Sequence, residues 1–147
     1  MASRSAPQRR TAASQNWPLR SYINYGMMRS MEETTPWSIE FYATARGERP
    51  AEAYIAGLPA RERAVIVRDI DLLRQFGVAL GLPTARHIEG SLWELRPGPH
   101  RVFYFIVTGR RCILLCGYRK HGDKAPAREI ARARRYMADW WEKERHG

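Results

Sequence analysis

Two apolar segments separated by a short turn constrain the fold of this chain more than any other feature. The first runs from His100 to Val107, with apolar or aromatic side chains at both odd and even positions, and the second runs from Cys112 to Tyr118. A strand that is apolar on both sides is covered on both faces of its sheet. Gly109-Arg110 suits a two-residue hairpin loop. The sequence therefore predicts an antiparallel strand pair inside a sheet.

Upstream of this pair, the sequence predicts a strand and a short helix. Apolar side chains alternate from Trp37 to Phe41, which is the period of a strand. Pro50 suits the first position of a helix that runs through Ala56 and ends at Gly57.

A longer helix is predicted between Pro59, which suits its start, and Gly77, which can take the left-handed conformation that ends a helix. Its predicted core positions, at helical spacing, are Ile66, Ile70, Leu73 and Phe76. Residues 77–91 contain Gly81, Pro83 and Gly90, and these breakers predict a loop.

Two further elements complete the predicted fold. A strand from Leu92 to Arg96 leads through the turn at residues 97–99 into the central pair. A helix opens at Pro126 and runs through Trp141. Its apolar stripe consists of Ile130, Ala133, Met137 and Trp140.

Length and composition predict one folded domain preceded by a basic extension. A chain of 147 residues with 44% apolar content can bury one modest core. Residues 1–35 are rich in arginine and poor in acidic and periodic apolar residues, so we expect a disordered extension before a domain at residues 36–147. A start codon assigned too far upstream would also explain the extension, because Met27, Met28 and Met31 all precede the first predicted strand. An RNA-binding arm is the functional alternative.

Charge and cysteine usage narrow the class of protein. The net charge of +10 favours nucleic acid or an acidic protein as partner. Cys112 and Cys116 would lie about 13 Å apart on one strand face, too far for a disulfide. Without a second ligand pair we expect no metal and no cofactor. Free cysteines suit the cytoplasm, and without an apolar run of about 18 residues we expect no membrane span.

The strand register predicts where cations gather. If Thr108 pairs with Arg111 across the hairpin loop, Arg101 lies opposite Tyr118, and both side chains share a face of the sheet. Arginine grips phosphate oxygens through a bidentate fork. Because Arg101 stands alone at the start of a buried strand, we expect it to bind a phosphate.

Neighbouring side chains extend this predicted site. Lys120 continues the alternation of Tyr118, and a tight turn would bring Arg96 close to Arg101. Mutual repulsion of these cations would be relieved by an anion between them. The plainer alternative is that Glu94 forms a salt bridge with Arg96, which lies two residues along on the same face.

The remaining candidates also have plainer interpretations. Tyr118 can simply close the edge of the core. The loop cations Lys120, His121 and Lys124 can be ordinary solvated charges, although loops that carry cations beside a strand arginine often serve function.

The chemistry that such a site could perform is limited. The sequence contains no paired carboxylates, no Gly-rich phosphate loop, no nucleophile elbow and no metal-binding motif. RNA cleavage remains open, because the ribose 2′-hydroxyl is the nucleophile and the protein supplies position, a base, an acid and cations. Arg101, Lys120 and Lys124 can supply the cations. Histidine titrates near neutral pH, so His121 is the natural acid–base candidate, and a lysine crowded by cations is the other.

Four segments occur in an order that resembles a known family. They are Leu92-Trp93-Glu94-Leu95-Arg96, His100-Arg101-Val102-Phe103-Tyr104-Phe105, Tyr118-Arg119-Lys120-His121 and Lys124-Ala125-Pro126. This order resembles the RelE/HigB superfamily of toxins, most closely its phage-derived Gp49-like branch, whose pattern is roughly LWELR, RVFYF and a KK-x3-K-TP-like segment that opens a helix. The resemblance extends over roughly residues 37–140.

The resemblance implies an α+β fold, a single RelE-like domain in which N-terminal helices pack on a small, mostly antiparallel sheet with a C-terminal helix. It also implies a metal-independent endoribonuclease that cleaves mRNA in the ribosomal A site. Its partner would be a cognate antitoxin, in the HigB-like branch usually a helix-turn-helix DNA-binding protein. We therefore expect a toxin of a type II toxin–antitoxin system that inhibits translation.

The resemblance and the residues together define the expected site. The expected catalytic residues are Arg101, Tyr118, Lys120 and His121, and the expected RNA- and phosphate-binding residues are Arg96, Arg119 and Lys124. The paired lysines of the family correspond here to Arg119-Lys120, which excludes a lysine base at position 119. The family often has a tyrosine where the last helix begins, and this chain has none between Tyr118 and Tyr136. The general base stays unassigned, and Tyr118 could replace the tyrosine or stack on an mRNA base.

Other functions stay open at this point. The same cations would suit a non-catalytic RNA- or ribosome-binding module, or a degenerate toxin that retains only the fold. A protein that docks an acidic partner through its basic surface is a third possibility. Substitution of Lys120, His121 and Tyr118 separates them, because only a nuclease has cleavage to lose.

Overall fold

The computed structural model describes residues 35–147. The predicted extension at residues 1–35 lies, apart from Thr35, outside the described residues, so its separate character remains a prediction. The described elements are, in chain order, β1 (Ser38–Phe41), α4 (Pro50–Ala56), α5 (Ala60–Phe76), the 3-10 helix η2 (Gly77–Ala79), β2 (Ala85–Glu89), β3 (Leu92–Leu95), β4 (His100–Val107), β5 (Arg111–Arg119) and α6 (Ala127–His146).

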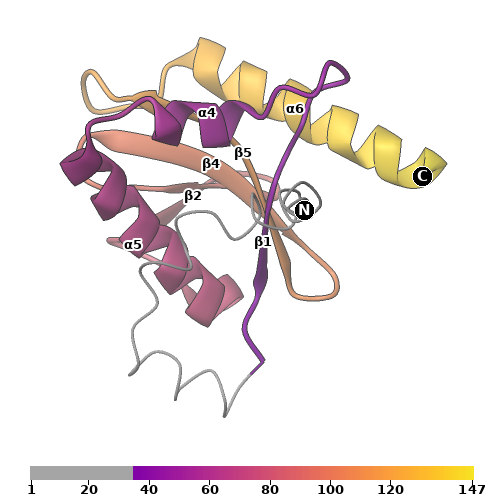
Figure 1. Cartoon of the computed structure of the whole chain (residues 1–147), viewed down its shortest axis with the longest axis horizontal. Coiled ribbons are helices and arrows are strands. Elements are labelled where there is room, and N and C mark those ends of the chain that lie inside the picture. The colour runs from indigo at the N-terminus through magenta and orange to yellow at the C-terminus, as the bar shows by residue number, and fades with distance from the viewer. Residues whose placement is uncertain (1–34) are drawn as a thin grey trace, which may run out of the picture.

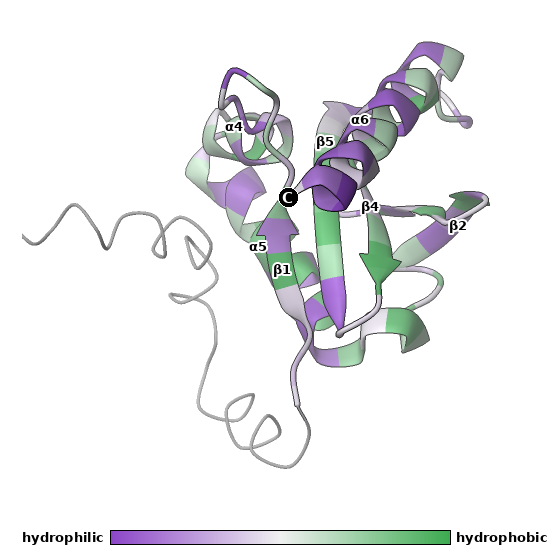
Figure 2. Ribbon diagram, turned by 90° about the vertical axis from the view of Figure 1, so that its right-hand side faces the viewer, coloured by the Kyte–Doolittle hydropathy of each residue, from purple (hydrophilic) through white to green (hydrophobic). Residues whose placement is uncertain are grey.

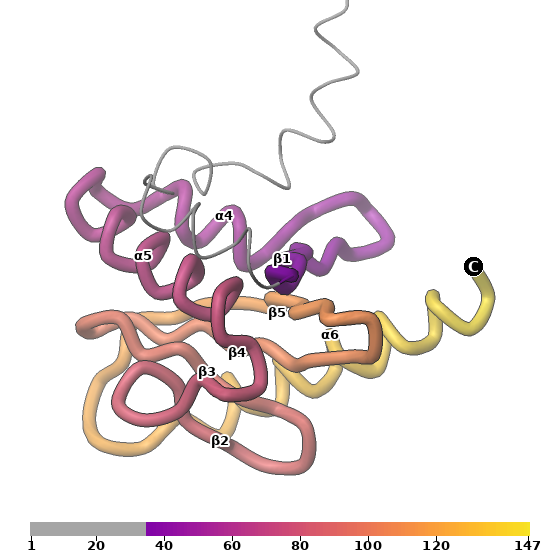
Figure 3. The backbone as a smooth tube through the Cα atoms, turned by 90° about the horizontal axis from the view of Figure 1, so that it is seen from below, coloured from indigo at the N-terminus to yellow at the C-terminus, as the bar shows by residue number. Residues whose placement is uncertain are grey.

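The strands form one five-stranded sheet in the order β1-β5-β4-β3-β2. β1 runs parallel to β5, and all other neighbours are antiparallel. Helices α4 and α5 pack on one face of the sheet and α6 packs on the other, so the molecule has three layers (Figures 1 and 3). The predicted α+β class, with a mostly antiparallel sheet and a C-terminal helix, is confirmed.

Each face of the sheet has its own hydrophobic core. The core beneath α4 and α5 contains Ile55, Ile70 and Tyr104. The core beneath α6 contains Phe105 and Trp140, whose ring centroids lie 5.3 Å apart. Successive side chains of a strand point to opposite faces, so β4 supplies both cores. Figure 2 shows the hydropathy of this arrangement, with apolar segments along β4 and β5 and many hydrophilic positions on α6.

The helices begin and end close to the predicted residues. Pro50 opens α4, and Pro59 precedes the first residue of α5. Gly77 ends α5 with a φ of 51° and a ψ of −120°, so the predicted positive φ is present outside the left-handed helical region. A Cβ atom at Gly77 would lie 2.0 Å from the ring of Trp37, so only glycine fits there. Helix α6 continues beyond its predicted end at Trp141.

Two predictions about the segment around Gly77 were wrong. Residues 77–91 are not only loop, because they contain η2 and the edge strand β2. The residues of β2 do not alternate clearly between apolar and polar, so the strand is recognisable only from its pairing with β3. Phe76 was expected in the core and is 44% exposed, because the last residue of α5 lies beyond the face that contacts the sheet.

The hairpin between β4 and β5 has the predicted pairing of Arg101 with Tyr118, but its loop length and register differ from the prediction. Val107, not Thr108, pairs with Arg111, so the loop has three residues and the predicted two-residue loop was wrong. A β-bulge in β5 then shifts the register by one, because Leu115 is an extra residue opposite the step from Phe103 to Tyr104 of β4. The two shifts cancel at the far end of the hairpin.

The bulge also changes the placement of the two cysteines. Cys112 belongs to the core beneath α4 and α5, whereas Cys116 belongs to the core beneath α6. The expectation that both would share one face was therefore wrong, because the extra residue reverses the alternation between them. Both thiols are free and buried, and burial raises the pKa of Cys112 to about 12 and that of Cys116 to about 11.

Candidate functional site

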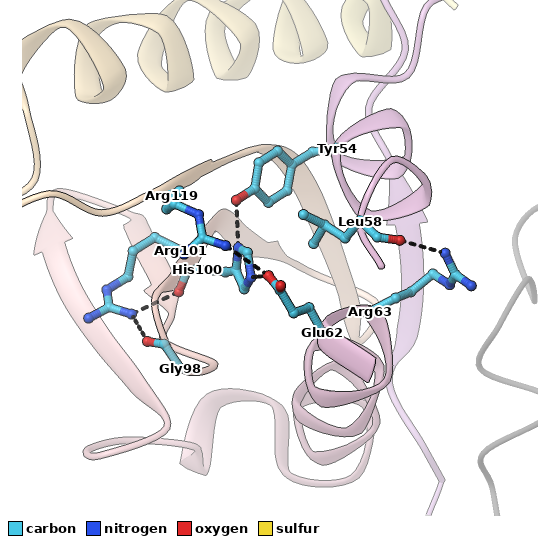
Figure 4. Close-up of polar contacts among 8 residues, drawn as sticks. All are labelled: Tyr54, Leu58, Glu62, Arg63, Gly98, His100, Arg101 and Arg119. Carbon is cyan, nitrogen blue, oxygen red and sulfur yellow. Dashed lines mark hydrogen bonds and ion pairs between the residues drawn. The ribbon is translucent and has the colours of Figure 1, made fainter. Parts of the chain in front are cut away.

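Arg101 and Tyr118 lie opposite each other where β4 begins and β5 ends, as the register predicted. Both side chains face the α6 side of the sheet, like Phe103 two residues further along β4. Nη1 of Arg101 donates hydrogen bonds to the carbonyl oxygens of Gly98 and His100, both at 2.8 Å (Figure 4). Arg101 is only 6% exposed. The turn before β4 therefore fixes the guanidinium in place.

A buried carboxylate lies between the two predicted strand arginines. Glu94 is 3% exposed, and its Oε2 lies 3.7 Å from Nε of Arg96 and 3.9 Å from Nε of Arg101. The structure thus brings Arg96 and Arg101 together, and it contains the Arg96–Glu94 pair that was the plainer alternative. The pairing of Arg101 with Glu94 was not expected. Burial raises the pKa of Glu94, and the charges of Arg101 and Arg96 oppose that rise.

Tyr118 of β5, opposite Arg101, also belongs to this group. Its ring stacks on Phe103, with centroids 5.6 Å apart and an interplanar angle of 27°. Burial, together with the charge of Glu94, raises the pKa of Tyr118 to about 12, although Arg101 acts in the opposite direction. The phenol therefore stays protonated at neutral pH, so it can donate a hydrogen bond and cannot serve as a base in this state.

The loop between β5 and α6 carries the other three candidates. The backbone N–H of Lys120 donates to the carbonyl of Pro99 at 2.8 Å, and the charge of Lys120 opposes the rise that burial causes in the pKa of Glu94. Lys120 therefore belongs to the group around Glu94. His121 and Lys124 are exposed and form no hydrogen bond or ion pair within residues 35–147. The structure connects neither residue to the group around Glu94 by a hydrogen bond or an ion pair among the described residues.

Arg119 lies on the other face of the sheet, because its position alternates with that of Tyr118. Its Nη2 donates to Oε1 of Glu62 at 2.9 Å, and the same oxygen lies 2.7 Å from Nε2 of His100. Nδ1 of His100 lies 2.6 Å from the hydroxyl of Tyr54 (Figure 4). Arg119 therefore belongs to this network beneath α4 and α5, and the structure does not bring it to Arg101.

This network was not found from the sequence, although it borders the site. His100 is 1% exposed and its ring is held between α4 and α5, while its carbonyl accepts the hydrogen bond of Arg101. Tyr54 reaches His100 because Gly117 has no side chain, since a Cβ there would lie 2.7 Å from the tyrosine ring. The available signal was a polar histidine at the start of a strand that is otherwise buried on both sides.

Arg86 is a second residue that sequence reasoning missed. It pairs with Glu94 in the register of β2 and β3, so both side chains lie on one face. Its positive charge contributes to lowering the pKa of Glu94 and that of Arg101. Arg86 could not be recognised because β2 itself was not predicted, and its side chain is exposed at the rim of the site.

Two further properties describe the same part of the chain. No three His, Cys, Asp or Glu side chains among residues 35–147 are placed to hold a metal ion together. None of the described helices combines the length and the apolar character that crossing a membrane requires.

The fold and the site define a class of small α+β protein with a mostly antiparallel sheet, one face of which ends in a cluster of cations around a buried carboxylate. Comparison with known families agrees with this class. The profile of the family described as Phage derived protein Gp49-like (DUF891) matches residues 53–138, which is more than half of the chain. The chain therefore belongs to this family, a RelE/HigB-like toxin family. A search of curated proteins found no match.

Family membership indicates a toxin of a toxin–antitoxin system and an antitoxin as its partner. The matched residues include both central strands and the loop that follows them, so the site lies inside the matched region. The three-layer fold is compatible with the RelE-like architecture that the resemblance implied.

Proposed function

We propose that the protein is a toxin that cleaves mRNA on the ribosome without a metal ion and thereby inhibits translation in the cytoplasm. The observation that carries this proposal is the group at the end of the α6 face of the sheet. Its members are the cations Arg86, Arg96, Arg101 and Lys120 and the buried carboxylate of Glu94. The excess of positive charge favours a phosphodiester, and cations fixed by the fold can stabilise a phosphorane-like transition state.

The position of each candidate residue would determine its role in binding the RNA. Arg101, fixed by the carbonyls before β4, would hold the scissile phosphate, and Arg96 would grip a second oxygen or the next phosphate. Lys120 would add charge from the loop side. The protonated phenol of Tyr118 would donate a hydrogen bond to the phosphate.

The exposed loop residues would act at the periphery of the substrate. His121 could protonate the leaving oxygen, and Lys124 could contact a neighbouring phosphate. Arg119 is part of the Glu62 network, yet its side chain is 48% exposed, so it would contact ribosomal RNA rather than the scissile phosphate.

The proposed partners follow from the same site. The ribosome and mRNA would bind the cationic end of the sheet. The antitoxin would neutralise the toxin, and from the resemblance we propose that it is a helix-turn-helix DNA-binding protein.

One observation favours a second candidate, a non-catalytic RNA- or ribosome-binding module. Arg96 and Arg101 already share a counter-ion, Glu94, and Arg101 is almost fully buried. A degenerate toxin that has kept its fold and charge would look the same. These candidates differ from the nuclease only in whether a group transfers a proton.

The test is induced expression of the full chain in a bacterial host, followed by mapping of mRNA 5′ ends. We expect growth arrest and new 5′ ends within translated frames. The variant Arg96→Ala plus Lys120→Ala should abolish both, because it removes two partly exposed cations while Arg101 still pairs with Glu94.

The matched control is Arg61→Ala plus Arg128→Ala, which removes two cations from exposed positions of α5 and α6. It should arrest growth like the wild-type chain. Soluble wild-type protein that binds ribosomes and yields no new ends would favour the binding module and reject the nuclease.

A further inference from the structure

The carboxylate of Glu94 is poorly satisfied for a buried ionic group. Its contacts with Arg96 and Arg101 measure 3.7 and 3.9 Å, which is too long for hydrogen bonds. Glu94 Oε1 and Arg96 Nε are both buried without a hydrogen-bond partner among the residues that the structure describes. Buried polar atoms in native proteins are nearly always paired, so these atoms need an explanation.

A structural ion pair of the same protein shows the contrast. On the same face of the sheet, beside Trp140 and Glu144 of α6, Arg111 forms two hydrogen bonds with Glu40, at 2.7 and 2.9 Å. That pair is partly exposed and fully formed, whereas Glu94 is 3% exposed and loosely paired. Glu94 therefore lacks the short bidentate hydrogen bonds that an arginine–carboxylate pair frequently forms.

The groups around Glu94 carry an excess of positive charge, which favours the binding of an anion. The groups that face it are Arg86 on β2, Arg96 after β3, Arg101 on β4, Tyr118 on β5, Lys120 in the following loop and, beyond Tyr118, Glu129 on α6. Four of these six are cations. A phosphate that approaches these cations would compete with Glu94 for the guanidinium groups of Arg96 and Arg101. The long contacts of Glu94 with these arginines would be replaced by contacts with the phosphate at little cost in free energy.

We propose that Glu94 is the general base of the reaction, a residue that neither the sequence nor the family resemblance had assigned. This inference rests on the proposed nuclease function. The carboxylate takes the proton of the ribose 2′-hydroxyl, and the 2′-oxygen attacks the adjacent phosphorus. The P–O5′ bond breaks, and the 5′-oxygen receives a proton from a protonated group of the loop, His121 or Lys120. The products are a 2′,3′-cyclic phosphate and a 5′-hydroxyl.

The electrostatics of the site suit this role. Burial raises the pKa of Glu94, while Arg101 and Arg96 hold it down. A bound phosphate would neutralise the charges of the two arginines. The arginines would then lower the pKa of Glu94 less, and the carboxylate would become more basic once substrate is present. A base whose pKa approaches the working pH is the most effective proton acceptor.

The experiment compares full-length wild-type protein with Glu94→Gln on ribosomes that carry a defined mRNA. We expect kcat to fall by about 100-fold or more. Ribosome binding should stay equal or become tighter, because the substitution removes a negative charge from a cationic site. The wild-type rate should rise with pH on its acidic limb and Glu94→Gln should lose that limb, because the base must be deprotonated to act. Glu94→Asp should recover part of the rate.

The matched control is Glu40→Gln, which removes a carboxylate from the other arginine pair and should leave kcat unchanged. Glu94→Gln with a rate near that of the wild type would overturn the inference and leave the nuclease proposal intact. A parallel loss of ribosome binding and thermal stability without a change in the pH profile would show a structural counter-ion, and would also overturn it. Absence of cleavage by the wild-type protein would reject the nuclease itself.

Discussion

Arg101 illustrates how one side chain takes its properties from two strands and the turn between them. Its own strand buries it and supplies the carbonyl of His100, the preceding turn supplies the carbonyl of Gly98, and β3 supplies the carboxylate of Glu94. Burial lowers the pKa of Arg101. The ordinary pKa of arginine lies far above neutrality, so the guanidinium keeps its charge. The residue is therefore a fixed cation rather than a mobile surface charge.

We expect Arg101→Lys to fold and to lose most of its cleavage. A lysine keeps the charge beside Glu94 and cannot form the fork that would hold two carbonyls and a phosphate oxygen together. Cleavage on ribosomes should fall by roughly 100-fold, with a loss of stability of about 1 kcal/mol from the missing hydrogen bonds. Thermal unfolding and mRNA 5′-end mapping measure the two effects.

Arg110→Lys is the matched control, because Arg110 donates to a backbone carbonyl, that of Thr35, far along the hairpin from the site. It should cleave at the wild-type rate. Full cleavage by Arg101→Lys would mean that the bidentate geometry is not used.

At the scale of elements, the end of the hairpin is held from both faces of the sheet. The His100 ring connects β4 to α4 through Tyr54 and to α5 through Glu62, and the next residue faces the site. The packing of two helices thus sets the position of the strand end that carries Arg101. Gly117 is the point at which this packing depends on a missing side chain.

We expect Gly117→Ala to destabilise the protein by about 1–3 kcal/mol, the usual effect of inserting a methyl group into a packed site. The new Cβ would displace the Tyr54 ring and break the 2.6 Å contact between Tyr54 and His100. Urea unfolding monitored by tryptophan fluorescence measures the loss. Gly81→Ala is the control, because no atom lies within 4 Å of the Cβ position and no loss from overpacking is expected.

The double variant Tyr54→Phe plus Gly117→Ala tests the cause. If the methyl group acts through the tyrosine contact, its effect should be smaller when the hydroxyl is already absent. Fully additive losses would instead mean that the methyl group acts through its clash with the ring, which phenylalanine keeps, and not through the hydroxyl contact.

For the whole molecule, the question is whether the domain predicted at residues 36–147 is sufficient. The described residues contain the sheet, its three helices and every member of the proposed site. The carbonyl of Thr35 accepts a hydrogen bond from the side chain of Arg110.

We expect a chain that begins at Met31 to be as toxic as the full chain, because it retains this contact and the whole site. Growth after induction and the pattern of mRNA 5′ ends measure the outcome, with equal protein levels confirmed by immunoblot. Loss of toxicity from a folded shorter chain would instead support an RNA-binding role for the basic extension.

Much of the fold and part of the candidate site could be predicted from the sequence. Local patterns determine β4, β5 and the three helices, because apolar periodicity and proline or glycine at helix ends act within a few residues. The pairing of Arg101 with Tyr118 was predicted correctly from a wrong register. The loop is one residue longer than predicted, and the β-bulge shifts the register back by one residue. The extra residue in β5 matters, because without it Tyr118 would face α4 and α5.

Only the tertiary structure decided what surrounds Arg101. The edge strand β2 exists through pairing with β3, so Arg86 enters the site through long-range hydrogen bonds that no local pattern marks. The burial of Glu94 between two arginines depends on three strands and a turn, and burial is what raises its pKa. The sequence by itself determined which charges the chain carries and on which strands. The fold decided their distances and their exposure to water, and these two quantities control the strength of electrostatic interactions.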